Sequence, residues 1–197
     1  MDGDGRQGSY SRKTAETDVS VSWAIDGQGE CRADTGVGFL DHMLAQLAKH
    51  GLFDLEVKAT GDLQVDEHHT IEDVGIALGR ALDAALGDRK GIARFGDALV
   101  PMDEALARVS VDLGGRGLAV VVAELVPAGG FKGEMVEHFL GSFAREARLT
   151  LHADVLRGEN DHHKIEALFK ALARVLEAAC RLDPRRANLL PSTKGVL

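Results

Sequence analysis

A short pattern of metal-binding side chains occurs twice in this chain, at residues 68–72 and 162–166. Each copy has two adjacent histidines, two other residues and a glutamate, and each follows a single upstream histidine at nearly the same distance. The two matching sets contain His42, His68, His69, Glu72, His138, His162, His163 and Glu166. Imidazole and carboxylate groups together suit manganese, zinc, iron or nickel. The repeat therefore predicts a site for two metal ions.

Helix geometry predicts how these ligands divide between two ions. Residues three or four positions apart share one helix face, whereas adjacent residues point about 100° apart. His69 and Glu72 are therefore expected to approach one ion, while His68 reaches the other. Exchange of ligands between the halves rests on symmetry alone and can be satisfied within one chain or between subunits. The predicted sets are His42, His69, Glu72 and His162 for one ion, and His138, His163, Glu166 and His68 for the other.

Hydrophobic periodicity indicates the elements that hold these residues. In the first half, we expect strands near residues 19–25 and 53–57, a helix over residues 39–50, and a helix from His68 to about Leu86. In the second half, we expect strands over residues 107–113, 118–126 and 149–156, and helices over residues 134–148 and from His162 to about Arg181. The continuous apolar run of residues 118–126 is typical of a buried strand. Asn160 and Asp161 supply N-cap chemistry for the last helix.

Both halves have the order strands, helix, strand, helix. This order predicts an α+β fold of internally duplicated half-domains, each a β-sheet with helices packed on one face. The predicted divisions are a loose N-terminal tail at residues 1–10, half-repeats at residues 11–92 and 93–186, and a C-terminal tail at residues 187–197.

Composition excludes several classes of function. The net charge of −8, with no basic stripe, argues against nucleic-acid binding. No apolar run reaches the roughly 18 residues that a membrane span needs, and the N-terminus has no apolar signal core. Cys31 and Cys180 are interpreted as reduced thiols of a cytoplasmic protein. A local cluster of basic residues is still compatible with a small phosphorylated substrate.

At its motifs the chain resembles the imidazoleglycerol-phosphate dehydratase family of histidine biosynthesis. The matching segments are residues 35–44, 66–73, 101–106, 160–170 and 191–195, and the resemblance extends from about Arg12 to the C-terminus. It implies the fold of the second domain of ribosomal protein S5, two Mn²⁺ ions per active site, and a homo-oligomeric shell, a 24-mer with active sites at subunit interfaces. The phosphatase domain of some members has no counterpart, so a monofunctional enzyme is expected.

The resemblance also implies a substrate, imidazole glycerol phosphate. Its ring can bridge two metals, and its phosphate suits arginine, lysine and hydroxyl donors. The implied substrate- and phosphate-binding residues are Glu16, His50, Arg94, Arg116, Lys170, Ser192, Thr193 and Lys194. The implied catalytic residues are Glu16 as the acid/base group, with His69, Glu72, His163 and Glu166. Two roles stay open for Asp103 and Glu104, which can hold the structure or support the metal ligands.

The implied reaction is a dehydration of D-erythro-imidazole glycerol phosphate to imidazole acetol phosphate. We expect the metal-bound ring to be stabilised as imidazolate and the adjacent hydroxyl to leave, giving a diazafulvene-like intermediate. Removal of a side-chain proton then forms the enol, which tautomerises to the ketone. Two alternatives remain from the residues alone: a di-metal hydrolase and a non-catalytic metal-storage or sensor protein. Neither explains the polar segment at residues 191–195, which can wrap an anion with backbone N–H groups.

Overall fold

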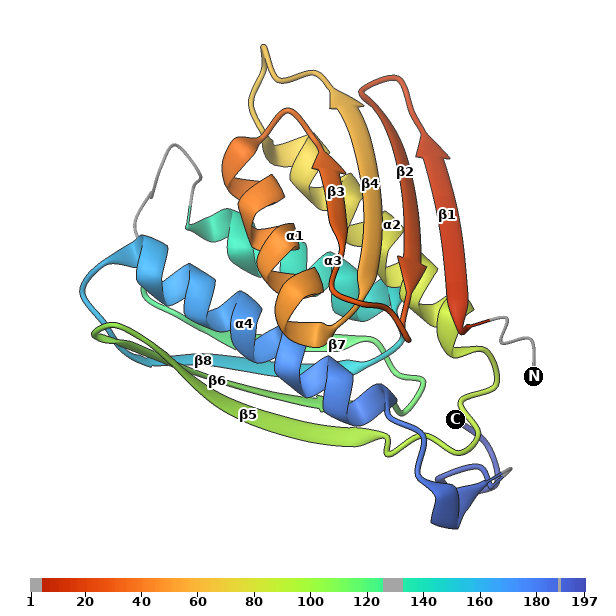
Figure 1. Cartoon of the computed structure of the whole chain (residues 1–197). Coiled ribbons are helices and arrows are strands. Elements are labelled where there is room, and N and C mark those ends of the chain that lie inside the picture. Colours follow the sequence, from red (N-terminus) through yellow and green to blue (C-terminus); the bar gives the residue numbers. More distant parts are fainter. Residues whose placement is uncertain (1–4, 126–132, 188) are drawn as a thin grey trace.

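Two β-sheets enclose a layer of helices in the computed structural model, which describes residues 5–125, 133–187 and 189–197 (Figure 1). The first sheet and its helices comprise β1 (Gln7–Lys13), β2 (Thr17–Ala24), β3 (Cys31–Asp34), α1 (Gly38–Gly51), β4 (Asp54–Gly61) and α2 (His68–Leu86). The second comprises β5 (Phe95–Met102), β6 (Ala105–Asp112), β7 (Leu118–Val122), α3 (Glu134–Glu146), β8 (Thr150–Arg157) and α4 (Asp161–Cys180), followed by the short 3-10 helix η1 (Pro184–Arg186).

The two sheets have the same topology. Their strand orders are β1-β2-β4-β3 and β5-β6-β8-β7, and in each the last strand in the order runs parallel to its neighbour while the others are antiparallel. The predicted α+β duplication, with helices on one face of each sheet, is therefore confirmed. The predicted junction near residue 92 falls in the segment between α2 and β5.

One continuous hydrophobic core joins the halves. After the buried Thr17, the inward residues of β2 are apolar, and Trp23 among them stacks on Phe143 of α3 with ring centroids 6.1 Å apart. Glycine lets α2 and α3 approach closely, since a Cβ on Gly79 would lie 2.6 Å from the Phe143 carbonyl oxygen. The halves therefore cannot shift relative to each other without breaking core contacts. This rigid packing fixes the starts of the helices that carry the histidines.

Two expectations were wrong. Residues 7–10 are not a loose tail, because they form the start of β1; residues 1–4 lie outside the described part of the chain. The inward positions of β1 are Gly8, Tyr10 and Arg12, which give no apolar alternation to detect. Strand β7 is not buried on both faces: it is the edge strand of its sheet and exposes Leu118, Val120 and Val122. The predicted end of that strand at residue 126 lies outside the described residues.

The helix signals were more reliable. Helix α2 spans His68 to Leu86 as predicted, and α4 ends at Cys180 beside the predicted Arg181. Asn160 is the N-cap of α4, and its side chain accepts a hydrogen bond from the His163 N–H. Among the helices of the described ranges, none combines the length and the apolar character that a membrane crossing requires.

Candidate metal centre

Histidines from opposite halves meet where pairs of helices pack together. Helix α1 packs on α4, which places His42 beside His162 with ring centroids 5.6 Å apart. Helix α2 packs on α3, which places His68 beside His138 with ring centroids 4.7 Å apart. Both copies of the repeated pattern lie at the N-terminus of their helix. The predicted exchange of histidines between the halves therefore occurs within one chain.

The first group of candidate ligands, here called the α1–α4 set, consists of His42, His162 and Glu166. The Nε2 atoms of both histidines lie 3.1 Å from Oε2 of Glu166. Ligands at adjacent corners of an octahedral ion with bonds of about 2.1 Å lie about 3.0 Å apart. The ligand atoms of the set all fall within 4.8 Å of one another. This donor set and spacing fit a divalent transition metal.

The Glu166 carboxylate is buried, with 5% of the residue exposed, and it remains charged. Burial raises the pKa of the Glu166 carboxyl, but Lys170, His42 and His162 act against it and leave the pKa below its ordinary value. The Lys170 ammonium lies 2.7 Å from Glu166 Oε1 and 3.1 Å from Met102 Sδ. Glu166 can therefore offer one oxygen to a metal while Lys170 holds the other.

The second group of candidate ligands, here called the α2–α3 set, is defined by two contacts of His68, with His138 and with Glu72. It is looser, since His68 Nε2 lies 4.0 Å from Glu72 Oε2. In both sets the glutamate pairs with the histidine four positions before it. In one chain, Glu72 and Glu166 therefore lie beside His68 and His162 rather than beside His69 and His163 as expected; which ion each carboxylate binds stays a prediction.

His69 and His163 lie outside both sets, each beside a carboxylate. His69 Nδ1 is 3.0 Å from Asp62 Oδ2 and 3.8 Å from Glu16, and the hydrogen bond with Asp62 raises the pKa of His69. His163 Nδ1 is 2.7 Å from Glu104 Oε2, which raises the pKa of His163 in the same way. A carboxylate at Nδ1 fixes the ring and leaves Nε2 as the coordinating atom in many metal sites.

Glu104 has a structural role that the sequence left open. Its Oε1 accepts hydrogen bonds from the backbone N–H groups of Glu159 and Asn160, just before α4. The Asn160 N–H and the His163 side chain lower the pKa of the Glu104 carboxyl to about 2. Asp103 Oδ2 lies 3.6 Å from His163 Nε2. The sequence does not reveal this partner of His69, because Asp62 directly follows Gly61 and such a pair is typical of an ordinary turn.

The predicted phosphate-binding residues of the tail gather around a cavity of about 240 Å³. Those that line it are Arg94, Arg116, Ser192, Thr193 and Lys194. Arg94 is already paired with Asp112 at 2.7 Å and donates to the Pro191 carbonyl, so it mainly holds the tail in place. Ser192 donates its hydroxyl proton to the Val196 carbonyl at 2.7 Å. Arg116 and Lys194 are thus the lining cations best able to receive an anion.

Lys170 and His50 do not line this cavity. Lys170 binds Glu166 as described, and His50 Nε2 lies 3.1 Å from the Gln46 side chain. Burial, and then the nearby Lys170 ammonium, lower the pKa of His50. The expected phosphate ligands are therefore divided between the α1–α4 set and the tail.

A single chain keeps the metal-ligand sets and the tail cavity far apart. Glu166 is on the second turn of α4, whereas the Arg94 N–H bonds to the Ala179 carbonyl at the other end of that helix. Glu166 and Ala179 are 13 residues apart on this helix, which is about 20 Å at 1.5 Å per residue. One small substrate cannot span that distance.

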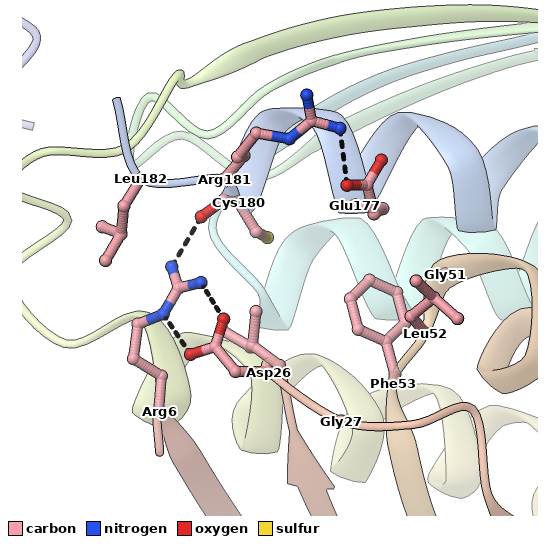
Figure 2. A pocket seen from close by; sticks show the side chains of 11 residues that line it. Arg6, Asp26, Gly27, Gly51, Leu52, Phe53, Glu177, Cys180, Arg181 and Leu182 are labelled. Atoms are coloured by element: carbon pink, nitrogen blue, oxygen red, sulfur yellow. Dashed lines mark hydrogen bonds and ion pairs between the residues drawn. The ribbon is translucent and has the colours of Figure 1, made fainter. Parts of the chain in front are cut away.

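Another cavity, of about 380 Å³, lies at the ends of α1 and α4 (Figure 2). Its charged side chains are paired with one another: Arg6 binds Asp26 and the Cys180 carbonyl, and Arg181 binds Glu177. These contacts tie the first strand to the end of α4. The cavity contains none of the predicted site residues.

Known proteins resemble this chain over almost its whole length. A family model described as imidazoleglycerol-phosphate dehydratase matches residues 35–176. Proteins named imidazoleglycerol-phosphate dehydratase from Chloroflexus aggregans and Dehalococcoides mccartyi are 58% and 56% identical to it, covering 98% of this chain and 96% and 97% of their own lengths.

Two solved structures with the same enzyme name have a similar fold. The one from Staphylococcus aureus is 39% identical, with a TM-score of 0.81, and covers 90% of this chain and 99% of its own. The one from Pyrococcus furiosus is 40% identical, with a TM-score of 0.82, and covers 95% of this chain and 100% of its own.

Proposed function

Since the chain belongs to the imidazoleglycerol-phosphate dehydratase family, a dehydratase family of histidine biosynthesis, we propose that it converts imidazole glycerol phosphate to imidazole acetol phosphate at a two-metal site shared between chains. The observation that carries the proposal is the pair of histidine sets formed across the halves. The two alternatives, a di-metal hydrolase and a metal-storage protein, explain neither the family relationship nor the basic residues around the tail cavity.

Manganese is the proposed native metal. The α1–α4 set and the α2–α3 set would each hold one ion, which supplies Lewis-acid stabilisation of the substrate ring as an anion. His69 and His163 of adjacent chains are proposed to complete the coordination through Nε2. The carboxylates on their Nδ1 atoms support this role, because they fix the ring orientation that such a contact needs.

Glu16 is proposed as the group that moves the proton. It lies in the turn between β1 and β2, with 56% of its side chain exposed and its carboxylate 3.8 Å from His69. The protonated Glu16 carboxyl would give its proton to the hydroxyl next to the ring, which leaves as water, and a diazafulvene-like intermediate would remain. Glu16 then removes the proton from the next carbon, giving an enol that tautomerises to the ketone. Arg116 and Lys194 bind the phosphate and orient the chain of carbons.

A homo-oligomer is proposed because the site is incomplete in one chain. The separation of the metal-ligand sets from the tail cavity requires a second copy near each set. The outer face of the second sheet supports self-association, since it exposes Phe95, Leu99, Leu118, Val120 and Val122. The outer face of the first sheet is polar at the matching positions, for example Ser9, Ser20 and Lys58. We propose the 24-subunit shell of the family as the assembled form.

A cytoplasmic location is also proposed. Cys31 and Cys180 are both free, which agrees with a reducing compartment.

The function is tested by supplying manganese-loaded protein with imidazole glycerol phosphate and measuring the keto product. We expect product formation that stops when a chelator removes the metal. Release of phosphate without ketone would instead identify a hydrolase. If neither product forms and each chain binds more than two metal ions, the protein is a storage protein. Full turnover in verified metal-free protein would contradict the proposed chemistry.

Replacement of Lys194 by alanine should raise KM about 10-fold or more with a smaller change in kcat. The phosphate is bound in both the ground state and the transition state, so loss of that contact weakens binding uniformly. Steady-state kinetics measures both constants. Lys58→Ala, which removes an exposed lysine from β4, is the control and should change neither. A fall in kcat at constant KM would show that Lys194 does not bind the phosphate.

Two inactive variants should restore activity when they assemble together. His162→Ala removes a ligand of the α1–α4 set, and the double variant Arg116→Ala/Lys194→Ala empties the tail cavity of its available cations. In a random one-to-one hybrid, a site built from two chains is intact in about a quarter of cases. Differently tagged variants are co-expressed, purified through both tags and assayed. A hybrid no more active than its parents would mean that each site uses one chain.

A further inference from the structure

The two related hairpin turns are held in different ways. In the turn between β5 and β6, the Glu104 carboxylate is used as a structural acceptor for backbone N–H groups. In the turn between β1 and β2, at residues 14–16, the backbone is held instead, and the Glu16 carboxylate stays exposed. The β1–β2 turn therefore leaves the Glu16 carboxylate free to contact a substrate, whereas the β5–β6 turn uses the Glu104 carboxylate in its own hydrogen bonds.

A chain of hydrogen bonds holds the first turn to α2. Thr14 Oγ1 accepts the backbone N–H groups of Glu16 at 3.1 Å and Thr17 at 3.0 Å. Thr17 Oγ1 donates to Oδ2 of Asp73, and Arg12 Nε donates to Oδ1 of Asp73 at 2.9 Å. Thr17 and Asp73 are buried, at 4% and 8% exposure. The turn that carries Glu16 thus rests on a buried carboxylate.

The number of protons available fixes which group donates and which accepts in each hydrogen bond of this series. The Asp73 carboxylate only accepts, so the single hydroxyl proton of Thr17 goes to it. The Thr14 hydroxyl, 3.2 Å from Thr17 Oγ1, must then donate to Thr17 and accept from the backbone. Each donor in the network then has one acceptor. The ion pair between Arg12 and Asp73 strengthens the hydrogen bonds to the Asp73 carboxylate.

The network occurs in only one copy of the repeated pattern. Asp73 follows Glu72 directly, whereas Ala167 follows Glu166 in the second copy and can form no such bond. Asp73 is therefore not part of the repeated pattern of histidines and glutamate, and its hydrogen bonds serve the β1–β2 turn alone.

We propose that Asp73 is a positioning residue for the reaction, acting through Thr17 and Thr14 to hold Glu16 against the substrate. The inference rests on the proposed acid/base role of Glu16. Displacement of a reacting group by about 1 Å costs up to about 100-fold in rate. Loss of the network should therefore lower kcat while substrate binding and metal binding persist.

The test uses two variants on different elements. Asp73→Asn keeps the size of the side chain, and Thr17→Val keeps the branched shape while removing the hydroxyl. Each should lower kcat about 10- to 100-fold in the manganese-loaded enzyme, with KM and bound manganese unchanged. Thr17→Ser should restore kcat, because it restores the hydroxyl. Thr60→Val, on the exposed face of β4, is the control for a threonine substitution and should change nothing.

A double variant separates this inference from the proposed role of Glu16. If Thr17 acts through Glu16, Thr17→Val should cost nothing further in single-turnover rate when Glu16 is already glutamine. Wild-type kcat in Thr17→Val, full additivity in the double variant, or a kcat loss that follows lost manganese would each overturn the positioning role. Wild-type kcat in Glu16→Gln would instead refute the acid/base role itself. Thr17→Val is read alone if Asp73→Asn does not fold.

Discussion

Glu16→Gln should lower kcat by about 100- to 10,000-fold and leave KM within a few-fold of the wild-type value. Glutamine has nearly the same size and can keep a hydrogen bond to the substrate, but it cannot take a proton. The backbone that carries residue 16 is held by Thr14 and should not change. Steady-state rates of ketone formation by the manganese-loaded enzyme measure the effect.

Glu56→Gln is the matched control for this change. Glu56 is an exposed glutamate on the outer face of β4, away from both histidine sets, so its replacement should leave both kinetic constants unaltered. Retention of wild-type kcat by Glu16→Gln would remove Glu16 from the proton transfer. Another carboxylate near His69, with Asp62 the first candidate, would then have to be examined.

Glu166→Gln should weaken metal binding at least about 10- to 100-fold and abolish activity at limiting manganese. Both histidines of the α1–α4 set point at this one carboxylate, and the neutral amide gives a metal ion far less attraction. The change also deprives the half-buried Lys170 ammonium of its partner, so some loss of thermal stability is expected. Equilibrium dialysis with manganese, followed by metal analysis, measures the affinity.

Glu177→Gln is the control on the same helix. Glu177 pairs with Arg181 at the surface, near the other end of α4, so its loss should affect neither metal content nor rate. If Glu166→Gln binds manganese as tightly as the wild type, Glu166 is not a ligand. Its carboxylate would then serve only to neutralise Lys170.

The repeat made the order of helices and strands predictable, and also that histidines of the two halves meet. Which of two adjacent histidines lies beside the glutamate was not predictable, because His68 and His69 are both close enough along the helix to share a face with Glu72. Packing of α2 on α3 decides it, by bringing His138 to His68. Such a contact depends on close approach at glycines such as Gly79, and periodicity does not reveal which helices will approach.

Strand β1 and edge strand β7 show a second limit of pattern reading. Gly8 in β1 faces inward because the α2 backbone lies against it, so the strand has no apolar stripe. The apolar run of β7 is equally compatible with burial in the fold and with an exposed edge that another chain covers. The hydrophobic pattern of one chain does not reveal its contacts with other copies. It therefore also does not reveal the substrate site that those contacts are proposed to complete.

The central claim is that the two copies of the pattern gather one metal ion each. Crystals grown with manganese and measured at its absorption edge test this most directly. We predict one anomalous peak between His42, His162 and Glu166, and a second between His68, His138 and Glu72. Strong peaks elsewhere, with neither of these positions occupied, would contradict the account.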